Sequence, residues 1–362
     1  ILGAARFTGP REVAVGGRLV RARRFVIATG SAPVLPPVEG LAQVPHFTNE
    51  TLFDNRVLPV HLLILGGGPI GLEMAQAHRR LGAKVTVIEM LRALSRDDAE
   101  LAAVVIHRLR AEGVEILEGT RVEKAEGGAG AIALTVSGAE GRRRIEGSHL
   151  LVAAGRAANV ADLGLEAAGV AYNARGVKVD AGLRSTNKRV YAVGDAAGGA
   201  QFTHLAGYHA GIVLRRALFR LPAKADPDIV PWATYTDPEL AYVGLDEGRA
   251  RENFAPITIL RWPYADNDRA QAERETDGLV KVITTRRGRI LGAGIAGAHA
   301  GELIQPWVLA VSQKMKIGAI AGMVAPYPTF GEVNKRAAGS FFTPKLFSPA
   351  TRRIVRFLAR FG

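Results

Sequence analysis

The sequence predicts an α/β fold with more than one domain, and two observations lead to this prediction. Its 362 residues are enough for two or three domains, each burying its own hydrophobic core. Between residues 61 and 117, strand and helix patterns alternate strictly, which describes a parallel, right-handed α/β unit. Beyond residue 231, several strand patterns precede the helical ones, which is typical of a separate α+β domain.

Each element is expected from hydrophobic periodicity and from glycine or proline boundaries. Short strands are predicted at residues 1–7, 12–15, 19–20 and 25–28. The α/β unit has strands at 61–65, 84–89 and 114–117 and helices at 72–81 and 97–113. An antiparallel meander over 121–148, strands at 149–153 and 190–193, and a helix over 204–219 follow. The last domain has strands at 233–244, 257–263, 278–284 and 290–295, and helices at 301–315 and 332–339.

A glycine-rich turn lies between the first strand and the first helix of the α/β unit. Gly66, Gly68 and Gly71 form a G-x-G-x-x-G pattern, where bare backbone and a helix N-terminus can receive a pyrophosphate. Glu89 closes the next strand, where its carboxylate can accept hydrogen bonds from a ribose diol. This favours NAD(H), while the nearby Arg92 leaves NADP(H) open; the alternative is a structural turn with a surface glutamate.

Two further turns flank this unit in the sequence. The segments 28–31 and 191–195 each end a buried strand in a tight turn, which implies one domain interrupted by another. Asp195, at a strand's carboxyl end, can bind a ligand hydroxyl or, alternatively, cap a helix N-terminus.

Six motifs in order resemble the class I pyridine nucleotide–disulfide oxidoreductases, the family of dihydrolipoamide dehydrogenase and mercuric reductase. They lie at residues 28–31, 66–73, 155–159, 191–195, 235–239 and 328–332. The resemblance implies an interrupted FAD-binding Rossmann-like domain (1–57 and 184–222) with an inserted NAD(P)-binding Rossmann-like domain (58–183). It also implies an α+β dimerisation domain (223–340), and hence a homodimer.

The resemblance implies roles for individual residues. Those expected to bind cofactor are Ala5, Thr29, Gly30, Asp195 and Thr203 for FAD, and Gly66, Gly68, Gly71, Glu89, Val122 and Gly155 for NAD(H). Glu73 is expected near the nicotinamide, or alternatively in a salt bridge on its helix face. Tyr327 and Glu332 complete the expected catalytic set, and a tyrosine at that position resembles mercuric reductase. With a pKa near 10, its phenol can donate a hydrogen bond or assist a metal ion, but it can also be a packed interface aromatic.

The expected activity is hydride transfer from NADH to FAD and on to a sulfur or metal-ion acceptor, the small-molecule electron acceptor of the reaction. The chain lacks two family features, a first glycine-rich FAD unit and the redox cysteine pair, and contains no cysteine at all. We therefore expect a chain that starts within its first domain. The alternative is a non-catalytic, dimerising NAD-binding remnant without a complete FAD site. No metal site is expected.

The net charge of +13 is concentrated at the two ends of the chain. Residues 1–24 carry +5 and residues 333–362 carry +7, so the body is nearly neutral and a nucleic-acid partner is not expected. Residues 341–362 predict a basic amphipathic helix, which can contact an anionic membrane surface, lead to a partner domain or pack on its own domain. No apolar run approaches the ~18 residues of a membrane span, and the predicted location is cytoplasmic, with peripheral membrane association open.

Overall fold

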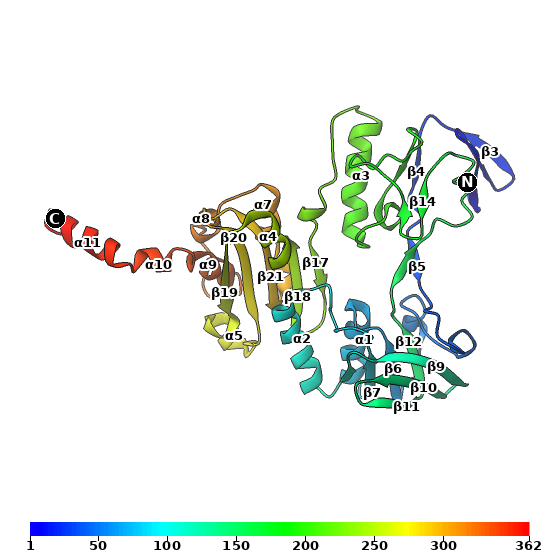
Figure 1. Cartoon of the computed structure of the whole chain (residues 1–362), viewed down its shortest axis with the longest axis horizontal. Helices are drawn as coiled ribbons and strands as arrows, with labels where there is room; N and C mark the ends of the chain where they lie inside the picture. Colours follow the sequence, from blue (N-terminus) through cyan, green and yellow to red (C-terminus); the bar gives the residue numbers. More distant parts are fainter. Residues whose placement is uncertain (362) are drawn as a thin grey trace. The chain divides into compact units, whose positions relative to one another are not determined.

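The computed structural model describes residues 1–361, which form two compact units (Figure 1). Unit 1 consists of residues 1–37, 48–50 and 152–227. Unit 2 consists of residues 38–47, 51–151 and the chain from 228 onward.

Unit 2 begins with the parallel α/β unit that the sequence predicts. Its sheet has the order β12 (His149–Val152), β6 (His61–Leu65), β7 (Lys84–Ile88), β8 (Glu115–Leu117), and β6–β7 and β7–β8 pair in parallel. Helix α1 (Pro69–Arg80) connects β6 to β7, and α2 (Ala99–Ala111) lies between β7 and β8. The strands are apolar along nearly their whole length because both faces of a parallel sheet are covered.

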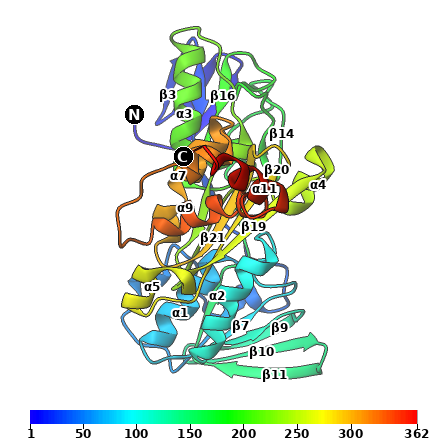
Figure 2. The same ribbon diagram turned by 90° about the vertical axis from the view of Figure 1, so that its left-hand side faces the viewer.

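An antiparallel meander lies alongside this parallel sheet, as Figure 2 shows. It is formed by β9 (Arg121–Gly128), β10 (Ala131–Gly138) and β11 (Gly141–Gly147), in the order β11-β10-β9. The meander expected over 121–148 is therefore confirmed. Gly147 approaches the parallel sheet so closely that a Cβ there would lie 2.6 Å from Leu63 Cγ.

The rest of unit 2 is a five-stranded antiparallel sheet with helices. Its strands have the order β17 (Trp232–Thr234), β18 (Glu239–Gly244), β21 (Ile290–Gly297), β20 (Leu279–Thr285), β19 (Ile257–Pro263). Its helices are α4 (Glu247–Phe254), α5 (Asp268–Glu273), α6 (Ala300–Leu303), α7 (Gln305–Ser312), α8 (Ile317–Ala321), α9 (Glu332–Gly339), α10 (Thr343–Leu346) and α11 (Pro349–Leu358). The strand predicted at 233–244 is interrupted, because residues 235–237 bind side chains of α1 instead of a neighbouring strand. The helix predicted at 301–315 is divided into α6 and α7, and Pro306 lies in the first turn of α7.

Helix α2 packs directly on this antiparallel sheet, so residues 58–151 of the expected nucleotide-binding domain lie in one compact unit with the expected dimerisation domain from residue 228 onward. A Cβ on Gly294 would lie 2.3 Å from Leu101 Cδ1, which shows how close the helix comes. The buried amine of Lys281, on β20, contacts Asp98 at 2.7 Å, and Glu100 and Glu247 at 3.2 Å. Burial alone would lower the pKa of Lys281, but the hydrogen bond with Asp98 and its other carboxylate neighbours hold it above the usual value.

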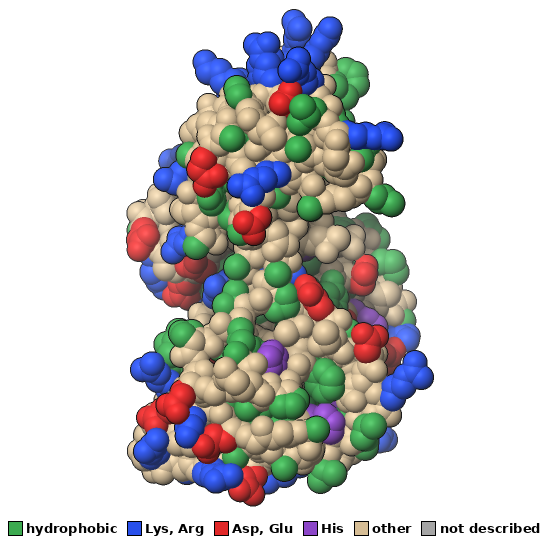
Figure 3. Space-filling view, turned by 90° about the vertical axis from the view of Figure 1, so that its right-hand side faces the viewer, with side chains coloured by type: hydrophobic (Ala, Val, Ile, Leu, Met, Phe, Trp, Pro, Cys, Tyr) green, Lys and Arg blue, Asp and Glu red, His purple; other side chains and the backbone are tan. Residues whose placement is uncertain are grey.

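Unit 1 is built from short strands and one long helix. A meander of β1 (Ala5–Gly9), β2 (Glu12–Val15) and β3 (Arg18–Arg21) precedes the parallel pair β4 (Phe25–Ile27) and β16 (Val190–Ala192). Two further antiparallel pairs are β5 (Ser31–Pro33) with β13 (Arg156–Ala158), and β14 (Tyr172–Asn173) with β15 (Gly176–Val177). Helix α3 (Thr203–Ala217) follows β16. Figure 3 shows Lys and Arg side chains gathered at the end of this unit where Figure 1 places β3, consistent with the basic first 24 residues.

The compact units do not follow all the domain boundaries expected from the family resemblance. Residues 152–183 were expected in the NAD-binding domain, but they lie in unit 1. The Phe7 N–H donates to the Leu163 carbonyl at 2.8 Å, and Val160, Leu165 and Val170 share a hydrophobic core with Phe7. These long-range contacts cannot be read from the periodicity of either segment.

The ion pairs of Lys281 with Asp98, Glu100 and Glu247 predict a measurable contribution to the stability of unit 2. Replacing Lys281 by Met should lower the free energy of unfolding of unit 2 by about 3 kcal/mol, because the buried Asp98 would lose its cationic partner. Urea unfolding followed by tryptophan fluorescence measures this, since Trp232, Trp262 and Trp307 all lie in unit 2. The matched control is Arg251→Met, which breaks an exposed ion pair with Glu247 and should cost less than about 1 kcal/mol. Equal effects of the two substitutions would contradict the account.

Candidate functional site

The glycine-rich turn between β6 and α1 forms an open cradle of backbone. A Cβ on Gly71 would lie 2.0 Å from the Gly66 carbonyl oxygen, so only glycine allows the helix to start this close to the strand. A Cβ on Gly68 would meet nothing within 4 Å, so the space beside Gly68 is free for a ligand. Helix α1 starts without a side-chain cap and has no acidic residue in its first turn. Its N-terminus therefore suits a phosphate.

The carboxylate of Glu89 holds this turn in place. It accepts hydrogen bonds from the Gly67 N–H at 2.7 Å and from the Leu91 N–H at 2.8 Å. Gly67 packs tightly against it, since a Cβ on Gly67 would lie 3.0 Å from Glu89 Cβ and 3.1 Å from Ala93 Cβ. Glu89 thus lies beside the glycine turn at the carboxyl end of β7, as a ribose-binding acid would.

Arg92, the residue that left NADP(H) open, is held by backbone. Its Nη2 donates to the carbonyl oxygens of Leu94 at 3.2 Å and Asp97 at 3.0 Å. Those contacts turn the guanidinium toward its own loop, which weakens the argument for a 2′-phosphate site.

Val122 lies at the start of β9, and the backbone just before this strand is hydrogen-bonded to Glu89. The Thr120 N–H donates to the Glu89 carbonyl oxygen at 2.9 Å, two residues before Val122. Val122 itself is buried and is the register partner of Val136. Its side chain therefore belongs to the core, and its backbone is the part near the candidate nucleotide site.

Glu73, on α1, binds a backbone amide of the five-stranded sheet. Its Oε1 accepts from the Tyr235 N–H at 2.9 Å. Burial raises the pKa of Glu73, and the Tyr235 amide offsets this only in part. One helical turn on, Gln76 Oε1 accepts from the Asp237 N–H at 2.7 Å, and Gln76 Nε2 donates to the Asp237 carbonyl at 2.6 Å. These contacts, which the sequence did not signal, fix α1 against residues 235–237.

Tyr327, one of the expected catalytic residues, is hydrogen-bonded to an aspartate of α5. Its Oη donates to Asp268 Oδ2 at 3.0 Å, and this bond raises the pKa of the exposed phenol. Glu332 instead lies 3.8 Å from Arg336 in an i,i+4 ion pair. Asn267 Nδ2 donates to the Thr329 carbonyl at 3.1 Å, so the start of α5 and the Tyr327 loop are joined twice. Asp268 was missed because an acid in a helical first turn is ordinary in any sequence.

Three of the predicted motifs converge in unit 1. Arg156 donates from Nε to Ser31 Oγ and from Nη2 to the Ser31 carbonyl, both at 2.7 Å, and Ser31 Oγ donates to Asp195 Oδ2 at 2.5 Å. Thr29 Oγ1 donates to the Asn159 carbonyl at 2.6 Å, and Asn159 Nδ2 donates back to the Thr29 carbonyl at 3.0 Å. Segments more than a hundred residues apart thus form one site.

The same region offers groups that suit a flavin nucleotide. Asp195 lies in a 3-10 turn (Gly194–Ala197), whereas α3 has Phe202 at its N-cap, so the alternative of Asp195 as the cap of α3 is wrong. The N-terminus of α3, which begins at Thr203, has no side-chain cap and no acid in its first turn. A Cβ on Gly30 would meet nothing within 4 Å, so its backbone is open to a ligand. Carboxylate, open backbone and helix N-terminus together fit the hydroxyls and phosphates of FAD.

Ala5 and Gly155, which are also expected to bind cofactor, both lie in unit 1. Ala5 is an exposed residue of β1 opposite Val15, and no hydrogen bond joins it to Thr29, Gly30 or Asp195 in the described chain. Gly155, at φ +126°, accepts from the Val34 N–H at 3.0 Å.

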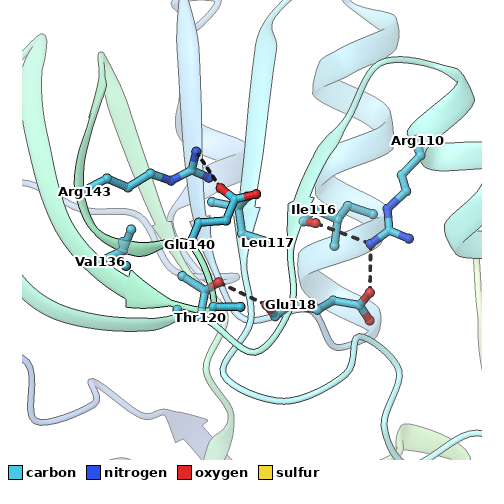
Figure 4. A pocket seen from close by; sticks show the side chains of 11 residues that line it. Arg110, Ile116, Leu117, Glu118, Thr120, Val136, Glu140 and Arg143 are labelled. Carbon is cyan, nitrogen blue, oxygen red and sulfur yellow. Dashed lines mark hydrogen bonds and ion pairs between the residues drawn. The ribbon is translucent and has the colours of Figure 1, made fainter.

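A separate surface pocket of about 270 Å³ lies beside β8, where the turn between β10 and β11 meets it (Figure 4). Its two cations are already paired: Arg110 with Glu118 at 2.8 Å, and Arg143 with Glu115 at 3.4 Å and Glu140 at 3.7 Å. It therefore offers no free charge to a phosphate. Within residues 1–361, no group of three or more His, Cys, Asp or Glu side chains could hold a metal ion.

Comparisons with known proteins identify the family to which the chain is similar. The family described as pyridine nucleotide-disulphide oxidoreductase matches residues 1–210, and its dimerisation domain matches residues 230–338. A mercuric reductase of Streptomyces lividans is 36% identical over 346 residues, covering 94% of this chain and 73% of the relative. A mercuric reductase of Bacillus cereus is 33% identical over 94% of this chain and 54% of its own length. The chain thus spans between about half and three quarters of these relatives.

Solved structures show the same similarity in three dimensions. The HOCl-induced flavoprotein disulfide reductase RclA of Escherichia coli has a TM-score of 0.84 and 29% identity, over 93% of this chain and 78% of RclA. LpdA of Mycobacterium tuberculosis has a TM-score of 0.85 and 26% identity, over 94% and 76%. The predicted fold class, two Rossmann-like domains plus a dimerisation domain, is confirmed. The chain belongs to the pyridine nucleotide-disulphide oxidoreductase family.

Proposed function

We propose that the protein is an FAD-dependent oxidoreductase that oxidises NADH and passes the electrons to a sulfur or metal-ion acceptor. The observation that carries the proposal is the cradle between β6 and α1, closed by Gly71 against Gly66 and held by Glu89. The relatives named mercuric reductase and dihydrolipoyl dehydrogenase support the two acceptor classes. The alternative, a non-catalytic NAD-binding remnant, finds no support in these comparisons.

The chain's own residues would divide the work between two sites. Gly66, Gly68 and the N-terminus of α1 would hold the pyrophosphate of NADH, and Glu89 would accept hydrogen bonds from the adenosine ribose. The carboxylate at Glu89 and the backbone-held Arg92 support NADH over NADPH. Glu73 would keep α1 in position through the Tyr235 amide.

Unit 1 would hold the flavin. Asp195, oriented by Ser31, would accept a hydroxyl of the nucleotide, while Gly30 and the start of α3 at Thr203 would face its phosphates. FAD, when bound, supplies the chemistry of accepting a hydride and passing electrons on. The 362 residues contain no cysteine, so no thiol of this chain takes part in the second half of the reaction.

We further propose that the protein acts as a homodimer in the cytoplasm and that Tyr327 faces the electron acceptor. The dimerisation-domain match supports the homodimer. Leu309, Val324 and Tyr327 are exposed apolar or aromatic side chains in this part of unit 2, which a partner copy would cover. Light scattering of the purified protein measures the mass directly.

A peripheral membrane contact through residues 341–362 is a further part of the proposal. Among the helices of residues 1–361, none has the length and apolar character needed to cross a bilayer. What supports a surface contact is the amphipathic helix α11, whose side chains from Arg352 onward are all exposed.

The proposed activity predicts NADH oxidation by the protein expressed from its whole reading frame. The preparation should absorb as a flavoprotein and oxidise NADH with a dye acceptor at least about tenfold more efficiently than NADPH, because Glu89 would repel a 2′-phosphate. The ratio of kcat/KM for the two nucleotides is the readout. A preparation without flavin absorbance that leaves NADH unoxidised would contradict the proposal.

The two glycines of the cradle predict opposite consequences for binding and folding. Gly68→Ala should fold normally, because its methyl meets nothing within 4 Å, but should weaken NADH binding at least about tenfold by filling the ligand's space. Gly71→Ala should instead destabilise the protein by about 1–3 kcal/mol, since its methyl would collide with the Gly66 carbonyl. Nicotinamide fluorescence titration and urea unfolding separate the two effects. Unchanged NADH affinity in Gly68→Ala would rule out this turn as the nucleotide site.

The Tyr327–Asp268 hydrogen bond predicts a pH dependence. Because the bond raises the pKa of Tyr327, its phenol stays protonated up to and beyond the ordinary value of about 10, so at neutral pH it is a donor. The difference in tyrosinate absorbance between the wild type and Tyr327→Phe should show a midpoint above that value. In Asp268→Asn, the midpoint should fall back toward it. A midpoint that Asp268→Asn does not change would show that the bond is not formed in solution.

A further inference from the structure

Helix α11 is an amphipathic helix with no partner in the described chain. Ser348 caps it by accepting from the Thr351 N–H, and Pro349 occupies its first turn, so its start is well defined. All residues from 352 to 361 are exposed, including five large apolar side chains between 57% and 76% exposed: Ile354, Val355, Phe357, Leu358 and Phe361. These exposed side chains contradict the alternative in which the helix packs on its own domain.

The charges and the apolar side chains of α11 lie on opposite sides. At 3.6 residues per turn, the three arginines of α11 (Arg352, Arg353 and Arg356) fall within an arc of about 100°, and Arg360 follows in the turn after the helix. The apolar side chains of α11 occupy the other side, and the ring of Phe357 meets that of Phe361, three residues beyond the end of the helix, edge to face with centroids 5.3 Å apart. Residues 333–362 contain no acidic residue, so no carboxylate of this segment neutralises the arginines.

This distribution favours a lipid surface over a second copy of the helix. Two copies joined through their apolar sides would bring six arginines together with no acid from the segment to pair with them. An anionic lipid surface supplies a phosphate for each guanidinium and an apolar layer for the phenylalanines. With ten residues, α11 is only about 15 Å long, half of a bilayer's hydrocarbon core, so it suits the interface plane.

We propose that α11 binds anionic phospholipid surfaces, with its phenylalanine side inserted among the acyl chains and its arginines at the phosphates. The inference rests on the membrane contact proposed above and names the lipid chemistry that it recognises. It also gives a function to the arginines of α11, which take no part in the proposed nucleotide site.

Flotation of the full protein with vesicles of phosphatidylcholine alone, and with added phosphatidylglycerol, tests this. We expect binding to the anionic vesicles only, weakened about 20-fold or more in Arg352→Gln/Arg356→Gln, at about fivefold per arginine. The matched control is Arg142→Gln/Arg144→Gln, which removes the same charge from exposed positions of β11 and should leave binding unchanged. Phe357→Ser/Phe361→Ser should also lose binding, and tryptophan fluorescence confirms that each variant is folded.

The remaining outcomes overturn the proposal in distinguishable ways. Equal binding to both vesicle types would keep the membrane contact but refute anionic recognition. Binding to neither would refute both. A loss of binding as large in the β11 control as in the α11 variant would assign the effect to net charge alone. If light scattering shows that Phe357→Ser/Phe361→Ser halves the mass, α11 instead joins two copies of the chain.

Discussion

The close approach of Gly71 to the Gly66 carbonyl is the constraint on which the nucleotide site depends. It allows α1 to start directly at the end of β6, so that the uncapped helix N-terminus faces the open space beside Gly68. Glu89, at the end of β7, accepts a hydrogen bond from the Gly67 N–H of this turn. The carboxylate that would bind the ribose therefore also holds the turn in place. The geometry of the turn and the proposed preference for NADH would therefore depend on the same few atoms.

Helix α1 is also fixed to a neighbouring segment of unit 2. Glu73 and Gln76 bind the backbone of residues 235–237, and the buried Lys281 ties the start of α2 to the five-stranded sheet. These contacts attach helices α1 and α2 to residues 230–338, the part of the chain that matches the dimerisation domain. In unit 1, the hydrogen bonds from Arg156 to Ser31 and from Ser31 to Asp195 join three distant motifs into one site.

Local sequence patterns predicted what depends on neighbouring residues. The strands β6 and β19 and the helix α9 have the predicted bounds, and the glycine turn lies where a βαβ unit requires it. What could not be predicted depends on contacts between distant segments. Residues 152–183 join unit 1 through the core around Phe7, and Tyr327 takes Asp268 as its partner, 59 residues away. Periodicity contains no information on either contact.

The central claim is that the turn between β6 and α1, together with Glu89, is an NADH site. Difference density from a crystal of the protein soaked with NADH tests it most directly. The account predicts the pyrophosphate at the N-terminus of α1, beside Gly68, and the adenosine ribose hydroxyls within hydrogen-bonding distance of the Glu89 carboxylate. A nucleotide bound elsewhere, or a soaked crystal with no nucleotide at this turn, would contradict it.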